Sequence, residues 1–185
     1  LRHLFDAAQE TGLNAIIFQI RPAADALYES AFEPWSSHLT GKMDLNPGYD
    51  PLAFAIEEAH FRGMELHAWF NPFRAQTNID KERSANHIAN TRSDWVKQYG
   101  NYLWLDPGNP EARDYTIQVM IDVVKRYDID GVHIDDYFYP YPYPSNDDAL
   151  PFPDDDTFER FGRGKKDDWR RSNVDRFIED LYKNI

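Results

Sequence analysis

The chain alternates continuous apolar runs with segments of helical periodicity, and this alternation limits its fold more than any other feature of the sequence. The apolar runs, which resemble buried strands in length and composition, cover residues 13–20, 64–70 and 131–135. The helical segments cover residues 1–10, 51–62, 110–127 and 169–185. Strands joined by helical crossovers pair in parallel, so the sequence predicts an α/β fold.

The boundaries of the helices carry signals of their own. Before the second and third helices a capping residue, Asp50 or Asn109, stands directly ahead of a proline at the first helical position. Gly63 closes the second helix at its C-terminal end. A further short helix is predicted near residues 86–98, inside the long segment between the second and third strands.

A doubly wound sheet and a (β/α)8 barrel both contain such units, and the ends of the strands favour the barrel. Polar and aromatic residues follow each strand, as at the catalytic face of barrel enzymes, and no glycine-rich phosphate-binding turn does so. A complete barrel takes about 250 residues. We therefore expect residues 1–185 to form part of one (β/α)8 TIM barrel domain, with about three parallel strands and four helices. The first strand and the later strands of that barrel are expected outside this chain.

Composition excludes several classes of protein. Lys and Arg number 20 against 32 Asp and Glu, a net charge of −12, so a nucleic acid partner is not expected. The absence of cysteine excludes disulfides, thiolate zinc sites and a cysteine nucleophile. No apolar run reaches the roughly 18 residues of a membrane span, so membrane insertion is not expected either. No motif predicts a cofactor or a metal.

Strand parity divides the side chains between the helix-facing and the inner side of the sheet. In the second strand the apolar, helix-facing set consists of Met64, Leu66, Ala68 and Phe70. The same count on all three strands turns polar residues inward near the strand ends. This inner rim gathers Gln19, Arg21, His67, Trp69, Asn71, His133, Asp135 and Tyr137. Agreement among three strand ends favours a ligand site over isolated residues that only satisfy hydrogen bonds.

Asp135 is the predicted catalytic centre of the rim, because a carboxylate at the inner end of a strand can act as nucleophile or base. Asp136, the second catalytic candidate, has the opposite parity and is expected to orient the loop. Arg21 would either keep Asp135 ionised or form a purely structural ion pair with it. A zinc site that includes Asp135 is an alternative.

Aromatic residues crowd the same strand ends, where their flat faces can lie against the CH faces of sugar rings. They are Trp69, Phe73, Tyr137, Tyr139, Tyr141 and Tyr143. The proline-interleaved segment 139–144 is too stiff for core structure and is predicted to form a wall of the rim. Phe70 and Phe138 are assigned to the core. The three aspartates at 154–156 predict a solvated loop that caps the next helix, with a calcium site as the alternative.

Seven runs of residues carry a family resemblance. They are Gln19-Ile20-Arg21-Pro22, Pro34-Trp35-Ser36, Tyr49-Asp50-Pro51-Leu52, the run from His67 to Arg74, that from Leu105 to Glu111, that from Asp130 to Pro140, and Trp169-Arg170-Arg171-Ser172-Asn173. In order and spacing they resemble the bacterial glycosyl-hydrolase-like 10 family, over nearly the whole chain. The Asp-Asp-Tyr-Phe-Tyr-Pro run at 135–140 and the Trp-Phe-Asn-Pro run at 69–72 are the specific ones.

The resemblance implies a (β/α)8 barrel glycosidase that acts on bacterial or other polysaccharide glycans, with some members linked to peptidoglycan. Residues 130–135 look like the fourth-strand signature of alpha-amylase-type retaining glycosidases, in which the last Asp, here Asp135, is the nucleophile. His133 stands where those enzymes have Arg, so sugar contacts and nucleophile ionisation would be arranged differently. The general acid in that comparison belongs to the following strand, outside this chain.

The expected mechanism is therefore retaining hydrolysis of an O-glycosidic bond by attack of Asp135 on the anomeric carbon. Arg21 and His133 would keep Asp135 ionised. The expected substrate-binding residues are Gln19, Arg21, His67, Trp69, Asn71, Arg74, His133, Tyr137 and Tyr139. Arg170 and Arg171, at the start of the last helix, would either reach this site or pair with Asp167 or Asp168.

Two alternatives stay open: a carbohydrate-binding barrel without catalysis, and an inverting hydrolase with its carboxylates about 6.5 to 9.5 Å apart. The expected partners are a poly- or oligosaccharide substrate and the remainder of the same barrel domain. The expected location is the bacterial periplasm, the cell surface or the secreted fraction, with the targeting signal outside this segment.

Overall fold

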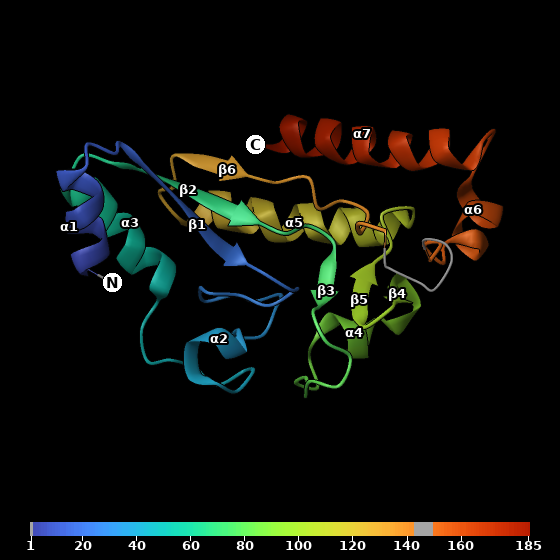
Figure 1. Ribbon diagram of the computed structural model, residues 1–185, viewed down its shortest axis with the longest axis horizontal. Helices are drawn as coiled ribbons and strands as arrows, with labels where there is room; N and C mark the ends of the chain where they lie inside the picture. The colour runs from blue at the N-terminus through green and yellow to red at the C-terminus, as the bar shows by residue number, and fades with distance from the viewer. Residues whose placement is uncertain (1, 143–149) are drawn as a thin grey trace.

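The computed structural model describes residues 2–142 and 150–185, and it contains a parallel sheet with helical crossovers, on the left in Figure 1. The parallel strands are β1 (Ala15–Arg21), β2 (Glu65–Phe70) and β6 (Gly131–His133), in the order β1-β2-β6. The helices that precede, connect and follow them are α1 (Arg2–Glu10), α3 (Pro51–Phe61), α5 (Pro110–Arg126) and α7 (Lys166–Asn184). The predicted α/β fold is confirmed, although the third parallel strand ends at residue 133 rather than 135.

The crossover helices begin where the capping signals predict. The Asp50 carboxylate accepts hydrogen bonds from the N–H groups of Leu52 and Ala53, both at 3.0 Å, ahead of α3. The Asn109 side chain accepts in the same way from the Glu111 N–H at 2.9 Å, ahead of α5. Each cap satisfies amide groups that the first helical turn leaves unpaired, so both helices start at fixed positions.

The hydrophobic core lies between the parallel sheet and its crossover helices. Leu66, Ala68 and Phe70 of β2 are fully buried, and Met64 just before the strand is 3% exposed, which confirms the helix-facing parity. The other face of the sheet is more open, and Ile17 of β1 is 53% exposed on it. Figure 1 shows β2 passing in front of α5. The predicted rim belongs to the face that the helices leave open.

The segment of chain between β2 and α5 forms a second sheet. The sequence predicts only one short helix in this segment. The strands of this sheet are β3 (Arg74–Gln76), β4 (Val96–Tyr99) and β5 (Tyr102–Leu105), antiparallel in the order β3-β5-β4. The helix predicted near 86–98 is right only in part, because α4 (Ile88–Thr91) and the 3-10 turn η1 (Ser93–Trp95) end before β4 begins. Strands of three or four residues contain too few alternations for periodicity to reveal them.

Asp154, directly before α6 (Asp155–Phe161), does not lie in a solvated loop, so that prediction is wrong for this residue. It is fully buried, and its carboxylate forms ion pairs with Lys166 at 2.8 Å and Arg170 at 2.6 Å. A buried carboxylate needs such partners, and α7 supplies them. Arg171 pairs with Asp168, so both arginines at the start of α7 are engaged in ion pairs rather than turned to the rim.

The stability of this corner is expected to depend on pH through Asp154. Burial raises the pKa of this carboxyl, but the bonds from Arg170 and Lys166 outweigh burial and lower the pKa below its usual 3.8. Because the folded pKa is depressed, the stabilisation is complete above the unfolded pKa and is lost as the pH falls through the folded value. In urea denaturation, Asp154→Asn should be less stable than wild type at about pH 7 and approach it near about pH 2. A difference in unfolding free energy that stays constant across this range would contradict the assignment.

Candidate active site

Three side chains form a row across the parallel sheet, one from each strand. The register pairs Gln19 with Trp69 and Trp69 with His133, so the three lie at one level on the open face of the sheet. The rings of Trp69 and His133 meet edge to face, with centroids 5.8 Å apart and planes at 89°. All three residues are half-buried. The structure thus brings these three predicted site residues together.

His67 faces the same side of the sheet but lies one layer deeper. It is level with Ile17 and Gly131, two residues before the row. Its Nε2 hydrogen bonds with the Glu65 carboxylate at 2.9 Å, and a Cβ atom added to Gly131 would come within 2.9 Å of its Nδ1. The glycine therefore leaves the space that the imidazole occupies. Because His67 bonds to the residue at the amino end of β2, the structure does not bring it to the rim.

Arg21 does not face the rim, and the prediction that it binds substrate or Asp135 is wrong. Gln19 pairs with Trp69, whereas Arg21 pairs with Phe70, the next residue of β2. Over this step β1 moves on by two residues while β2 moves on by one, as in a β-bulge. From that point each residue of β1 faces the opposite side of the sheet from the one that strict alternation predicts. Arg21 follows Phe70 to the packed side of the sheet, where it is fully buried.

Arg74 lies beside the loop that follows β6. Its Nε donates to the Pro22 carbonyl at 3.0 Å, and its Cζ lies 5.4 Å from the centre of the Tyr137 ring. Burial lowers the pKa of Arg74, and this is opposed by Tyr137 and by the negative charge of Asp135. Within residues 2–142 and 150–185, no carboxylate forms an ion pair with this guanidinium. A half-buried guanidinium therefore lies over the ring of Tyr137, the residue whose N–H holds Asp135.

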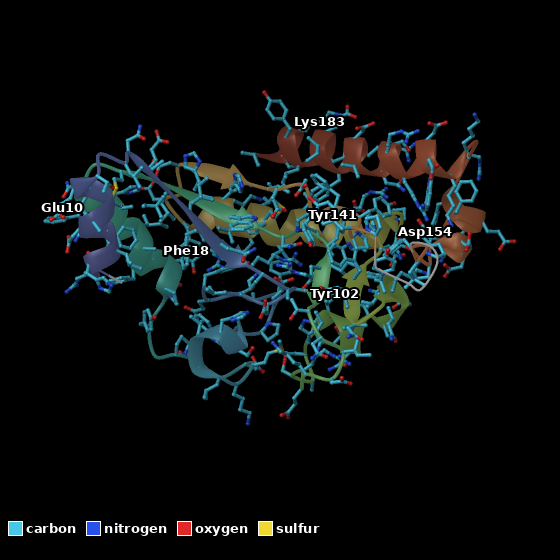
Figure 2. The ribbon with its side chains drawn as sticks, in the orientation of Figure 1. Glu10, Phe18, Tyr102, Tyr141, Asp154 and Lys183 are labelled. Atoms are coloured by element: carbon cyan, nitrogen blue, oxygen red, sulfur yellow. The ribbon has the colours of Figure 1, made fainter. Side chains whose placement is uncertain are left out.

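The two candidate catalytic carboxylates differ in their surroundings. Asp135 is half-buried, and its Oδ1 accepts a hydrogen bond from the Tyr137 N–H at 3.1 Å, which fixes the turn after β6. Asp136 is exposed and accepts a hydrogen bond from the Tyr141 hydroxyl, and this bond raises the pKa of Tyr141. Figure 2 shows Tyr141 near the middle of the molecule, on the loop that leaves β6. The more sheltered carboxylate is the one that strand parity selects.

The tyrosines after β6 diverge. The Tyr137 ring packs on Tyr141 at 5.0 Å between centroids, beside the Arg74 guanidinium. Tyr139 turns to the C-terminal helices, where its hydroxyl accepts a hydrogen bond from the Asn173 side chain at 3.2 Å. The structure therefore does not place the Tyr139 hydroxyl in the row, and its role in binding substrate stays a prediction. Tyr143 and Pro144, the rest of the predicted wall, lie outside the described residues.

The residues directly after β2 hold their loop rather than face outward. Asn71 is 1% exposed, and its side-chain oxygen accepts a hydrogen bond from the Arg74 N–H at 3.4 Å. Phe73, predicted to face sugars, is fully buried and packs on Phe177 of α7 at 5.0 Å, so that prediction is wrong. Phe70 is buried and Phe138 also packs on Phe177, as the core assignment requires.

Three residues that the sequence patterns do not single out shape the region. Trp104 of β5 is buried and donates its indole N–H to the Phe138 carbonyl at 2.8 Å, which ties the second sheet to the loop after β6. Glu33 is the buried partner of Arg21. Asp25, 2% exposed, accepts a hydrogen bond from the Ala23 N–H at 2.9 Å in the turn after β1. The one available signal was the place of Glu33 next to the Pro-Trp-Ser run.

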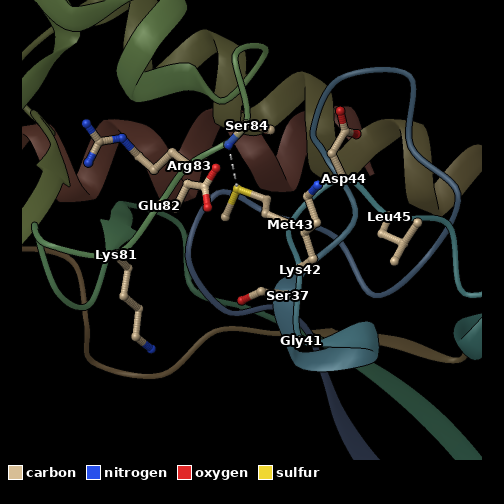
Figure 3. Close-up of a pocket in the computed structure, with 10 residues that line it drawn as sticks. All are labelled: Ser37, Gly41, Lys42, Met43, Asp44, Leu45, Lys81, Glu82, Arg83 and Ser84. Carbon is tan, nitrogen blue, oxygen red and sulfur yellow. Dashed lines mark hydrogen bonds between the residues drawn. The ribbon is translucent and has the colours of Figure 1, made fainter.

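A separate cavity of about 600 Å³ opens between two loops and shares no residue with the row (Figure 3). One loop contains α2 (Ser37–Thr40) and residues 41–45, and the other is formed by residues 81–84. The Ser84 N–H donates to the Met43 sulfur at 3.5 Å and joins the two loops. In the part of the chain that the structure describes, no cluster of three His, Asp or Glu residues could hold a metal ion.

The parallel sheet, its crossover helices and the polar strand ends define part of a (β/α)8 barrel, a fold that similar solved structures share. The GH36 alpha-galactosidase AgaA from Geobacillus stearothermophilus, solved in complex with raffinose, is similar with a TM-score of 0.60 and 15% sequence identity. That similarity covers 100% of this chain and 24% of the alpha-galactosidase chain, and it concerns the fold. The chain belongs to the glycosyl hydrolase-like 10 family, whose model matches residues 2–185.

Curated bacterial relatives agree with this assignment. Glycosyl hydrolase YngK of Bacillus subtilis is 48% identical over 188 residues, which cover 98% of this chain and 36% of that protein. Glycosyl hydrolase DigH of Escherichia coli K12 is 39% identical over 193 residues, which cover 97% of this chain and 43% of DigH. The chain therefore spans less than half the length of these relatives. Among the described residues, no helix has the length and hydropathy needed to cross a membrane.

Proposed function

We propose that this chain forms part of the catalytic domain of a retaining glycoside hydrolase that cleaves O-glycosidic bonds in a cell-envelope or other polysaccharide glycan. The observation that carries the proposal is the half-buried Asp135 just beyond the carboxyl end of β6, held by the Tyr137 N–H at 3.1 Å, with the Arg74 guanidinium over the Tyr137 ring. Substrate-binding and catalytic groups of barrel enzymes collect at this end of the strands. Membership of a hydrolase-like family supports the reaction class.

In the proposed mechanism Asp135 attacks the anomeric carbon and forms a glycosyl-enzyme bond. A carboxylic acid about 5 to 5.5 Å away protonates the leaving oxygen and then activates water to release the sugar. We place that acid outside this chain. Arg74, whose guanidinium lies over the Tyr137 ring beside the turn that holds Asp135, takes the place at the site that the sequence assigns to Arg21. Gln19, Trp69 and His133 offer polar edges and a flat indole face to the sugar.

The remaining barrel strands belong to the same proposal. In the described residues β1 and β6 each pair with β2 alone, so both are edges of the parallel sheet, and the open face exposes 53% of Ile17. Edges and apolar faces of this kind are normally covered. We propose that flanking sequence supplies the other strands, and we call the chain together with them the full-barrel protein. Its location in the periplasm, at the cell surface or outside the cell is part of this proposal.

The experiment that tests the proposed function is a digestion assay. The full-barrel protein is incubated with purified bacterial cell-wall glycan and with neutral polysaccharides, and new reducing ends are counted while the anomeric configuration of the product is followed by NMR. Release of reducing ends with retained configuration is the expected result. Binding without cleavage would favour the non-catalytic carbohydrate-binding barrel, and inverted configuration would favour the inverting hydrolase.

Trp69 provides a prediction about binding. Its Nε1 is buried without a hydrogen-bond partner in residues 2–142 and 150–185, while its ring lies in the row beside His133. Trp69→Ala in the full-barrel protein should weaken oligosaccharide binding by about 1 to 3 kcal/mol, the scale of a lost large apolar contact. Isothermal calorimetry on both proteins measures this difference. Unchanged affinity together with a large drop in melting temperature would show that Trp69 stabilises the core and does not bind the sugar.

A further inference from the structure

Two arginines cross between the ends of β1 and β2 in opposite directions. Arg21, at the end of β1, donates from Nη1 to the carbonyl oxygens of Asn71 at 2.7 Å and Pro72 at 3.0 Å. Arg74, beyond the end of β2, donates from Nε to the Pro22 carbonyl at 3.0 Å. The backbone joins the same segments, since the Asn71 N–H donates to the Arg21 carbonyl at 2.9 Å. Each strand end thus holds the other.

Only one of these guanidinium groups is neutralised. Arg21 is fully buried, and Glu33, whose side chain is 1% exposed, accepts from its Nε at 2.8 Å and from its Nη2 at 2.5 Å. A bidentate pair of this kind fixes the plane of the guanidinium. The remaining terminal nitrogen, Nη1, is therefore aimed at the two carbonyl groups. Glu33 is held in turn, because its N–H donates to the Ser30 hydroxyl at 3.2 Å.

The segment that Arg21 holds leads directly to Arg74. The Pro72 carbonyl accepts a second hydrogen bond from the Thr116 hydroxyl of α5 at 3.1 Å. The next residue, Phe73, offers its carbonyl to the Leu105 N–H of β5 at 2.7 Å. Residues 71–73 are therefore bonded to Arg21, to α5 and to β5. Arg74 is the next residue, and its guanidinium lies beside the Tyr137 ring.

We propose that Arg21, oriented by Glu33, is a positioning residue that fixes the carbonyls of residues 71 and 72 and thereby sets the Arg74 guanidinium over the Tyr137 ring, beside the turn that holds Asp135. The proposal rests on the proposed function of Asp135. Stability alone does not explain such a pair, because apolar residues of similar volume often replace buried ion pairs at no loss of stability. The two bonds from Nη1 to one loop indicate a role in geometry.

The test replaces the pair by apolar residues of similar size, Arg21→Met with Glu33→Leu, in the full-barrel protein. The fold should persist, with a melting temperature close to wild type. Hydrogen exchange followed by mass spectrometry should show amides of residues 71–76 exchanging about tenfold faster, the effect of losing about one hydrogen bond. On a glycan substrate kcat should fall about a hundredfold with KM retained, because a displaced Arg74 acts on the reacting carboxylate.

The matched control is Arg62→Met with Glu58→Leu, which removes an ion pair of 2.8 Å between the last turn of α3 and the residue that follows the helix, at the opposite end of β2 from this loop. It should leave exchange at 71–76 and kcat unchanged. Arg21→Lys is a second variant, which keeps the charge opposite Glu33 but loses the planar set of donors. Unchanged exchange at residues 71–76 in folded Arg21→Lys, or in the folded Arg21→Met, Glu33→Leu double variant, overturns the proposal. Failure of that double variant to fold overturns it as well. An inactive wild type would refute the proposed function while leaving the exchange result to decide the positioning role.

Discussion

Asp135→Asn in the full-barrel protein is expected to lower turnover of a glycan substrate by several orders of magnitude while leaving substrate binding largely intact. The amide is nearly isosteric with the carboxylate and can still accept the Tyr137 N–H that fixes the turn after β6. It cannot form the glycosyl-enzyme bond. Reducing-end release measures turnover, and calorimetry with an oligosaccharide measures binding. Equal activity of the variant and wild type would exclude Asp135 as nucleophile.

The neighbouring carboxylate is the matched control. Asp136 is exposed and bonded to the Tyr141 hydroxyl, so Asp136→Asn should cost much less, through the orientation of the loop. A mechanism-based fluorosugar provides a direct assignment, because fragmentation of the labelled peptide shows which carboxylate carries the sugar. Label on Asp136 would mean that the chain bulges between His133 and Asp135 and that strand parity is misleading at this end.

Strand parity succeeds on β2 and fails at the end of β1 for a physical reason. Every residue from Glu65 to Trp69 pairs in unbroken register with β1, so the alternation predicts which side each residue faces. One extra residue in β1 after Gln19 then reverses the alternation, and Arg21 moves from the rim to the packed side. A bulge arises from pairing with a neighbouring strand, so the residues of β1 alone do not reveal it.

Long-range partners account for the other differences. The helix caps depend on residues two or three positions away, so Asp50 and Asn109 could be recognised from the sequence. Glu33 pairs with a residue 12 positions distant, and Arg74 reaches a carbonyl 52 positions distant. Nothing in the local pattern indicates which acid will neutralise which arginine. The family resemblance predicts more of the fold than local patterns do, because it rests on runs of residues at all the strand ends. It does not, however, show that Arg74 rather than Arg21 lies near Asp135.

The role of the second sheet also depends on contacts between residues far apart in the sequence. Periodicity does not predict β3, β4 or β5, yet β5 carries the indole that bonds the loop after β6. Arg74 itself begins β3, so the sheet also fixes the backbone from which the guanidinium of the site projects. The insertion after β2 is therefore part of the candidate site rather than a peripheral loop.

Trp104→Ala should lower the free energy of unfolding by about 3 to 5 kcal/mol, because the indole is 1% exposed and its removal leaves a large cavity. Trp104 also packs on Tyr137 at 5.7 Å between centroids and donates to the Phe138 carbonyl at 2.8 Å, so the loop that carries Asp135 should lose these two contacts.

Trp104→Phe is the matched control. It keeps most of the apolar contact and loses the hydrogen bond, at a cost of about 1 to 2 kcal/mol. Urea denaturation gives both values, and turnover in the full-barrel protein should fall more in the alanine variant than in the phenylalanine variant. A loss of less than about 1 kcal/mol in the alanine variant would show that other contacts hold the loop after β6.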